Sequence, residues 1–126
     1  MKTTIPIILT FIFLLPQLAM SQNDDNSTTI KRIDKKEFKE AIASQEFIVL
    51  DVRTEEEFEA GHIEGAKLLD FTSDSFEEGL SFIPKSKKYL IYCQSGNRSS
   101  KALQKMKEVG FEYVLELEGG YSHWTK

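Results

Sequence analysis

The chain has 126 residues, enough for one domain with a single hydrophobic core. Its 16 basic and 20 acidic residues give a net charge of −4, and its lysines are interspersed with glutamates. This charge pattern argues against a nucleic-acid-binding surface. The single cysteine, Cys93, excludes an intramolecular disulfide as a source of stability.

The first 21 residues have the layout of a secretory signal peptide. A lysine at position 2 precedes the apolar run IPIILTFIFLLPQLAM, and Ala19-Met20-Ser21 offers a small-x-small cleavage site. The run is shorter than the roughly 20 residues of a spanning helix and contains two prolines, so we favour cleavage after Ser21 over an uncleaved membrane anchor. We therefore expect an exported protein, periplasmic in a Gram-negative bacterium and otherwise secreted, that meets the membrane only through this segment.

A polar linker is expected at residues 22–29, followed by one domain at residues 30–126. The sequence TIKRI at the start of this domain predicts a short edge strand. Asp34 and Glu37 have the spacing of a capping box, and apolar residues follow them at helical intervals, which predicts the first helix.

The sequence FIVLDV, at residues 47–52, is a continuous apolar run typical of a strand that is buried on both faces. Thr54 and Glu57 form a second capping box, which opens the short helix EEEFEA. Gly61 is well placed to end this helix. We interpret the charged run of the helix as a solvated face.

The sequence AKLLDF, at residues 66–71, is the next candidate strand. Residues 73–83 then predict a helix that Gly79 weakens and Pro84 ends. The sequence KYLIYC, at residues 88–93, predicts another buried strand, which carries the cysteine at its carboxyl end.

Residues 99–109 give the clearest helical pattern in the chain, and residues 111–117 predict a last strand. A turn and a terminal helical fragment follow at residues 118–126, where we expect Tyr121 and Trp124 to close the core. Because strands alternate with helices, the sequence predicts an α/β fold with a parallel sheet of about five strands and helices on both faces.

Cys93 lies at the carboxyl end of its strand, which is where open parallel sheets bind ligands. The loop CQSGNRSS runs from it directly into the predicted helix. Unpaired backbone N–H groups at a helix N-terminus favour negative charge and lower the pKa of a cysteine from its usual value of about 8.5. Gly96 allows the backbone to curl these N–H groups toward the sulfur, and Arg98 adds a positive charge suited to an oxyanion.

We expect Ser99 or Ser100 to cap the helix and to offer a hydroxyl. The loop then forms an anion cradle with Cys93 as a nucleophile at its floor. The alternative is that Cys93 is only a small buried hydrophobic residue, which is the usual fate of a free cysteine.

The pattern Cys93-x-x-Gly96-x-Arg98-Ser99 resembles the active-site loop of single-domain rhodanese-like sulfurtransferases. The sequences DVR, GHIEGA, GF and LEGGYSHW fall in that family's order and spacing, so the resemblance covers about residues 30–124, which is nearly the entire expected mature chain. One departure is that Glu64 stands where the family often has a proline, and the sequence KLLDF follows in place of the usual apolar-proline turn.

The resemblance implies a persulfide mechanism without a metal or organic cofactor. Cys93 would attack the outer sulfur of a donor such as thiosulfate, release sulfite, and pass the bound sulfur to cyanide or a thiol acceptor. Backbone amides would stabilise the charge of the terminal sulfur. The residues expected to bind the substrate are Gln94, Ser95, Gly96, Asn97, Arg98 and Ser99.

Three other functions fit parts of the pattern. Phosphatases that use a cysteine and an arginine have five residues between the two, whereas four separate Cys93 from Arg98, which favours sulfur over phosphate or arsenate. A non-catalytic persulfide carrier that delivers sulfur to another protein would have the same loop. An inactive structural domain is the third alternative.

Two further pairs of residues could take part in chemistry. His62 or His123 could form a dyad with the cysteine, but the helix terminus can lower the pKa of the thiol without a base, and we favour structural roles for both. Asp51 and Arg53 could act as an acid–base pair. A buried ion pair that braces the end of the strand is the simpler interpretation.

Overall fold

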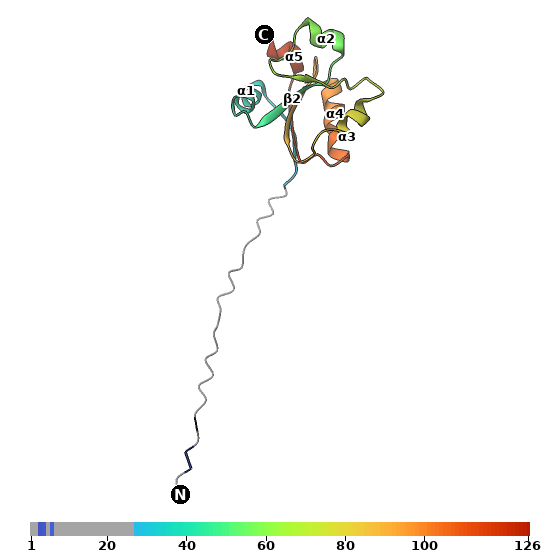
Figure 1. Ribbon diagram of the computed structural model, residues 1–126. Helices are drawn as coiled ribbons and strands as arrows, with labels where there is room; N and C mark the ends of the chain where they lie inside the picture. Colours follow the sequence, from blue (N-terminus) through green and yellow to red (C-terminus); the bar gives the residue numbers. More distant parts are fainter. Residues whose placement is uncertain (1–2, 5, 7–26) are drawn as a thin grey trace.

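The computed structural model describes residues 3–4, 6 and 27–126. Figure 1 shows the α/β domain that residues 29–126 form, with helices on either side of a central sheet. Most of the predicted signal peptide and most of the predicted linker lie outside the described residues. None of the helices formed by the described residues has both the length and the apolar character that a bilayer crossing requires.

The sheet has five parallel strands in the order β1-β5-β4-β2-β3. This arrangement confirms the predicted parallel sheet. The strand predicted at residues 66–71 is shorter than expected, because only its start pairs regularly with the edge of the sheet. The strands are β1 (Thr29–Ile33), β2 (Phe47–Asp51), β3 (Lys67–Leu68), β4 (Lys88–Tyr92) and β5 (Tyr113–Leu117).

Helices cover both faces of the sheet, as predicted. The helices α3 and α4 contribute to the core on one face, and α1 and α5 contribute to the core on the other. The helices are α1 (Lys35–Ala43), α2 (Glu55–Ala60), α3 (Phe76–Ser81), α4 (Asn97–Glu108) and α5 (Gly120–Trp124).

Strand β4 is the centre of the sheet and contributes to both cores by simple alternation. Tyr89 and Ile91 belong to the α3/α4 side, whereas Leu90 and Tyr92 belong to the α1/α5 side, and all four are fully buried. Cys93 continues this alternation and lies in the α3/α4 core. The strand therefore determines which helix the sulfur faces.

The two predicted capping boxes differ in the structure. Thr54 and Glu57 form a complete box at the start of α2, since each side chain bonds to the other residue's backbone N–H. At the start of α1, the Asp34 carboxylate accepts a hydrogen bond of 2.9 Å from the backbone N–H of Glu37. That contact is one half of the box.

Helix α4 starts earlier than predicted. It begins at Asn97 rather than Ser99, and its N-cap is Gly96, which has a left-handed backbone with φ of +101°. A glycine can make this turn without the steric cost that a Cβ imposes. The prediction that Ser99 or Ser100 caps the helix is therefore wrong, and both residues lie within its first turn.

The terminal helix closes the core on the α1 side, as predicted from its aromatic residues. The Trp124 ring packs edge-on against Phe38, with 5.8 Å between ring centroids. Tyr121 lies beside Tyr92 at 6.1 Å, and its ring also faces the Arg53 guanidinium at 4.3 Å. Helix α5 therefore packs beside the residues that support the loop after Cys93.

Candidate active site around Cys93

Cys93 follows directly after β4, and its loop leads into α4. Strand β4 lies between β5 and β2, so the cysteine is at the carboxyl end of the central strand. The residue is only 1% exposed. The sulfur is thus buried in the core on the α3/α4 face of the sheet rather than displayed on the surface.

The loop compensates the burial of the sulfur with hydrogen bonds. The Gly96 backbone N–H donates to Sγ at 3.1 Å, and the Ser99 hydroxyl oxygen lies 3.3 Å from Sγ. Burial raises the pKa of the Cys93 thiol. Hydrogen bonding between the sulfur and the Ser99 side chain, and then from the backbone N–H groups of Ser99, Gly96 and Ser95, outweighs it, so the pKa lies below its ordinary value.

Gly96 is held from the side of the first strand. Its carbonyl oxygen accepts a hydrogen bond of 2.9 Å from Arg32 Nη2 on β1. A Cβ added at Gly96 would lie 3.3 Å from the same nitrogen, in addition to the strain of the left-handed backbone. A glycine at this position therefore lets an arginine approach the loop while its N–H points at the sulfur.

The start of α5 holds the other end of the loop. The backbone N–H groups of Tyr121 and Ser122 donate to the carbonyl oxygens of Cys93 and Gln94, at 2.7 and 3.0 Å. Gly120 has φ of +64°, and a Cβ there would lie 2.5 Å from the Cys93 carbonyl oxygen. Gly120 lies in the sequence motif LEGGYSHW, and its contact with the loop was not predicted from the sequence.

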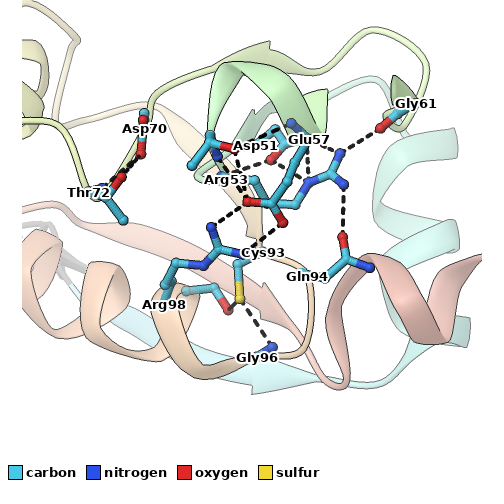
Figure 2. A network of polar contacts seen from close by, with 12 residues as sticks. Asp51, Arg53, Glu57, Gly61, Asp70, Thr72, Cys93, Gln94, Gly96 and Arg98 are labelled. Carbon is cyan, nitrogen blue, oxygen red and sulfur yellow. Dashed lines mark hydrogen bonds and ion pairs between the residues drawn. The ribbon is translucent and has the colours of Figure 1, made fainter. Parts of the chain in front are cut away.

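Arg98 does not stand free at the rim of the loop. Figure 2 shows its guanidinium against Glu57 of α2, in a two-pronged contact at 2.6 and 2.9 Å. Hydrogen bonding from Arg98, above all, lowers the pKa of Glu57 from 4.5 to about 2. The expectation that the EEEFEA run is only a solvated face is therefore wrong for Glu57.

Asp51 and Arg53 form the buried ion pair that the sequence predicted. The Arg53 side chain is 2% exposed, and Nη2 lies 2.7 Å from Asp51 Oδ2. The same guanidinium donates to Gln94 Oε1 at 3.0 Å and to the Gly61 carbonyl at 2.6 Å (Figure 2). This pair links the ends of β2, α2 and β4 and fixes the Gln94 side chain.

The other predicted binding residues differ in their placement. Ser95 and Asn97 are exposed and flank the buried Gly96, so they line the outer side of the loop. The Gln94 side chain is turned toward Arg53. A role for these three residues in substrate binding stays a prediction.

Neither histidine forms a hydrogen bond with the sulfur among the described residues. His62 is exposed, stacks on Phe58 with 3.7 Å between ring centroids, and bonds through Nδ1 to the Phe58 carbonyl at 2.9 Å. His123 is exposed on α5, where its Cβ lies near Gly119. Both placements fit the structural roles that we favoured, and they leave the activation of the thiol to the loop.

The loop can therefore hold a sulfur anion at a fixed position without a base. A thiolate is the nucleophilic form of cysteine, and the backbone N–H groups that stabilise it are already oriented. An atom bonded to Sγ would extend beyond the sulfur while the loop continued to hold Sγ itself. This arrangement suits a covalent intermediate on the cysteine.

The Glu57–Arg98 pair should make stability depend on pH in a defined window. Because the pKa of Glu57 is depressed on folding, its contribution is full above the ordinary value of 4.5 and is lost as the pH falls toward about 2. We expect wild type to be more stable than Glu57→Gln at pH 6, with the difference shrinking below pH 4.5. Urea unfolding across this pH range measures the difference in the free energy of unfolding.

Glu59→Gln, an exposed change on the same helix, is the control. A difference between wild type and Glu57→Gln that stays constant with pH would contradict the depressed pKa of Glu57.

Gly120→Ala should disturb the ionisation of Cys93, whereas Gly65→Ala should not. Both glycines have left-handed φ angles, so both changes carry similar backbone strain. Only at Gly120 would the new Cβ overlap the Cys93 carbonyl, since nothing lies within 4 Å of the corresponding position at Gly65. We expect the midpoint of the pH curve for Cys93 alkylation to rise in Gly120→Ala alone. Equal midpoints in the two variants would show that the α5 contact does not shape the loop.

The curated proteins that this chain resembles include a thiosulfate sulfurtransferase and a putative sulfur carrier protein. The chloroplastic thiosulfate sulfurtransferase 16 of Arabidopsis thaliana is 38% identical over 87 residues, which are 61% of this chain and 72% of the relative. The putative sulfur carrier protein YrkF of Bacillus subtilis is 32% identical over 104 residues, which are 82% of this chain and 55% of the relative. The chain spans between 21% and 37% of the length of other, longer curated relatives.

The solved structures that this chain resembles include rhodanese-related proteins. The rhodanese-like domain protein of Staphylococcus aureus superposes with a TM-score of 0.67 at 32% identity, over 75% of this chain and 90% of that chain. The family described as Rhodanese-like domain matches residues 34–126, which include α1 to α5 and the whole loop after Cys93. The chain therefore belongs to the rhodanese-like domain family.

Proposed function

We propose that this domain moves a sulfane sulfur from a small donor such as thiosulfate, through a persulfide on Cys93, to cyanide or a thiol acceptor. The proposal rests most directly on one observation. A buried sulfur at the end of the central strand receives a backbone N–H from its own loop and has a lowered pKa. Sulfurtransferase activity in the broad sense is supported by the family and by the thiosulfate sulfurtransferase among the relatives.

The two half-reactions balance without a cofactor. In the first, the Cys93 thiolate attacks the outer sulfur of thiosulfate, the sulfur–sulfur bond breaks, and sulfite leaves with the electron pair. In the second, the acceptor attacks the outer sulfur of the persulfide, and the Cys93 thiolate is the leaving group. A thiolate of low pKa leaves more readily, so the hydrogen bonds to Sγ favour the second step as well as the first.

Anion binding in this proposal depends more on backbone N–H groups than on Arg98. The Arg98 guanidinium is paired with Glu57, so a donor anion near the loop meets a largely neutralised pair. The Gly96 N–H, by contrast, is directed at the sulfur itself. This arrangement supports small sulfur anions as donors and gives Arg98 mainly the task of joining the loop to α2.

A persulfide carrier is the second candidate, favoured by the similarity to the putative sulfur carrier protein YrkF. Such a protein would load Cys93 in the same way but would pass the sulfur only to a protein partner. The two functions differ in turnover. An enzyme cycles with small donors and acceptors, whereas a carrier stops after one sulfur per cysteine.

Loading and turnover are measured on the same preparation. After thiosulfate treatment, we expect mass spectrometry to find one added sulfur on Cys93, and we expect continued thiocyanate formation when cyanide is supplied. Cys93→Ser should abolish both without unfolding the domain, because the hydroxyl is nearly isosteric but is not ionised at neutral pH. A single burst of one sulfur per chain would favour the carrier. Undiminished turnover in Cys93→Ser would exclude the proposed mechanism.

We also propose that the domain acts outside the cytoplasm, since residues 1–21 have the layout of a cleavable signal. A free thiol in an oxidising compartment persists best when it is buried, and Cys93 is buried. The mass of the protein recovered from the cell envelope or the medium tests cleavage after Ser21. An intact N-terminus in a membrane fraction would instead support the anchor.

A further inference from the structure

A buried carboxylate, Glu116, lies next to the nucleophile, and the two half-reactions give it no role. It is 1% exposed, on strand β5. Its backbone pairs with Ile91 of β4 on one side and with Arg32 of β1 on the other. Val114, two residues earlier on the strand, belongs to the same α3/α4 core as Cys93. Alternation therefore directs the Glu116 side chain toward that face, beneath the start of α4.

Glu116 has two partners there. Arg32 forms an ion pair with it, with Nε 2.8 Å from Oε1 and Nη2 3.2 Å from Oε2. The Ser99 hydroxyl donates to Oε2 at 2.5 Å. A short contact of a hydroxyl with an ionised carboxylate is a strong hydrogen bond, so Ser99 is firmly held by Glu116.

The same hydroxyl is also a hydrogen-bond partner of the sulfur. Ser99 Oγ lies 3.3 Å from Cys93 Sγ, with the thiol as donor. A serine hydroxyl has one hydrogen to give. While that hydrogen is on Glu116, Ser99 can accept from the S–H group of Cys93, but it cannot donate to a thiolate. Ionised Cys93 and ionised Glu116 therefore compete for one hydrogen.

We propose that Glu116 is a positioning residue that restrains the ionisation of Cys93 by holding the Ser99 hydroxyl. Arg32 weakens this effect, because it also bonds to the Glu116 carboxylate. Glu116 therefore keeps a hydrogen-bond partner when the Ser99 hydroxyl donates to the sulfur instead. The inference rests on the proposed function, in that it assigns a control to the same nucleophile. Once a persulfide forms, the charge lies on the outer sulfur and Ser99 can return to Glu116. The restraint thus falls on the empty thiolate rather than on the loaded state.

Other charged groups surround the sulfur and set the background for this effect. They come from each element packed against the loop, and they are mostly paired with one another. They form three groups: Arg98 on α4 with Glu57 on α2 and Asp70 after β3, Arg32 on β1 with Glu116 on β5 and Glu118 just after it, and Arg53 with Asp51 at the end of β2.

Glu116→Gln tests the inference, since glutamine keeps the shape and is a weaker acceptor in either orientation of its amide. We expect the midpoint of the pH curve for Cys93 alkylation by iodoacetamide to fall by about one unit, which is tenfold more thiolate at a pH below the midpoint. Glu118→Gln is the matched control, because it removes the same charge from an exposed carboxylate that acts on Arg32 through space. We expect it to shift the midpoint far less. An unchanged or raised midpoint in Glu116→Gln would overturn the inference.

A double-mutant cycle separates action through Ser99 from a plain loss of charge. In a Ser99→Ala background, Glu116→Gln should shift the midpoint by less than half of its effect in wild type. Equal shifts in both backgrounds would show that Glu116 acts only through its charge, and the positioning role would fall. If Glu116→Gln does not fold, Glu116→Asp replaces it, since it keeps the charge for Arg32 and withdraws the carboxylate from Ser99. A lowered midpoint is again expected, and an unchanged one counts against the inference.

Failure of this inference and failure of the proposed function give different results. Alkylation by iodoacetamide requires no sulfur donor or acceptor, so it reports on Cys93 whether or not the chain transfers sulfur. A shifted midpoint without thiocyanate formation would support the positioning role of Glu116 and exclude the proposed enzymatic activity. Normal turnover with no shift in Glu116→Gln would exclude the Glu116 role and leave the enzyme standing.

Discussion

The site depends on one constraint: a cysteine sulfur with a lowered pKa is buried at the end of the central strand, away from the water that would solvate its charged form. Its own loop has to replace that water with hydrogen-bond donors, and the loop therefore needs a fixed shape. Three guanidinium groups, each paired with a carboxylate, fix it from different sides. Arg53, which is paired with Asp51, donates to the Gln94 side chain, and Arg32, which is paired with Glu116, donates to the Gly96 carbonyl. Arg98 belongs to the loop region itself and is paired with Glu57 of α2.

The pattern of apolar runs and helix caps was enough to predict the fold and the position of Cys93 within it. Continuous apolar runs of strand length, separated by capped helical segments, allow little besides a parallel sheet covered on both faces. Such a sheet gathers its strand ends at one edge, so Cys93 had to lie there. The start of α4 was mispredicted because its cap is Gly96, which has no side chain to signal a helix start, whereas Ser99 and Ser100 look like ordinary caps.

The partners of the loop were harder to find, because each comes from a distant part of the chain. Glu57 stands in an acidic run that looks solvated, and only the fold brings it to Arg98, 41 positions away. Glu116 did leave a signal in the sequence, since it interrupts the apolar strand VLEL and a buried acid requires a partner. That signal does not predict that the partners are Arg32 and Ser99, because the order and register of the strands decide which side chains meet.

The contacts that hold the loop also impose an order on its folding. Arg32 and Glu116 are 84 positions apart, and Gly120 closes against the Cys93 carbonyl from the last helix. Contacts of such long range form late, since a large loop must be closed before any of them is made. A growing chain would emerge from the ribosome with its cysteine complete but its cradle unfinished. The thiol therefore behaves like that of any unfolded peptide until the first strand and the last helix have docked, and its reactivity is a product of maturation.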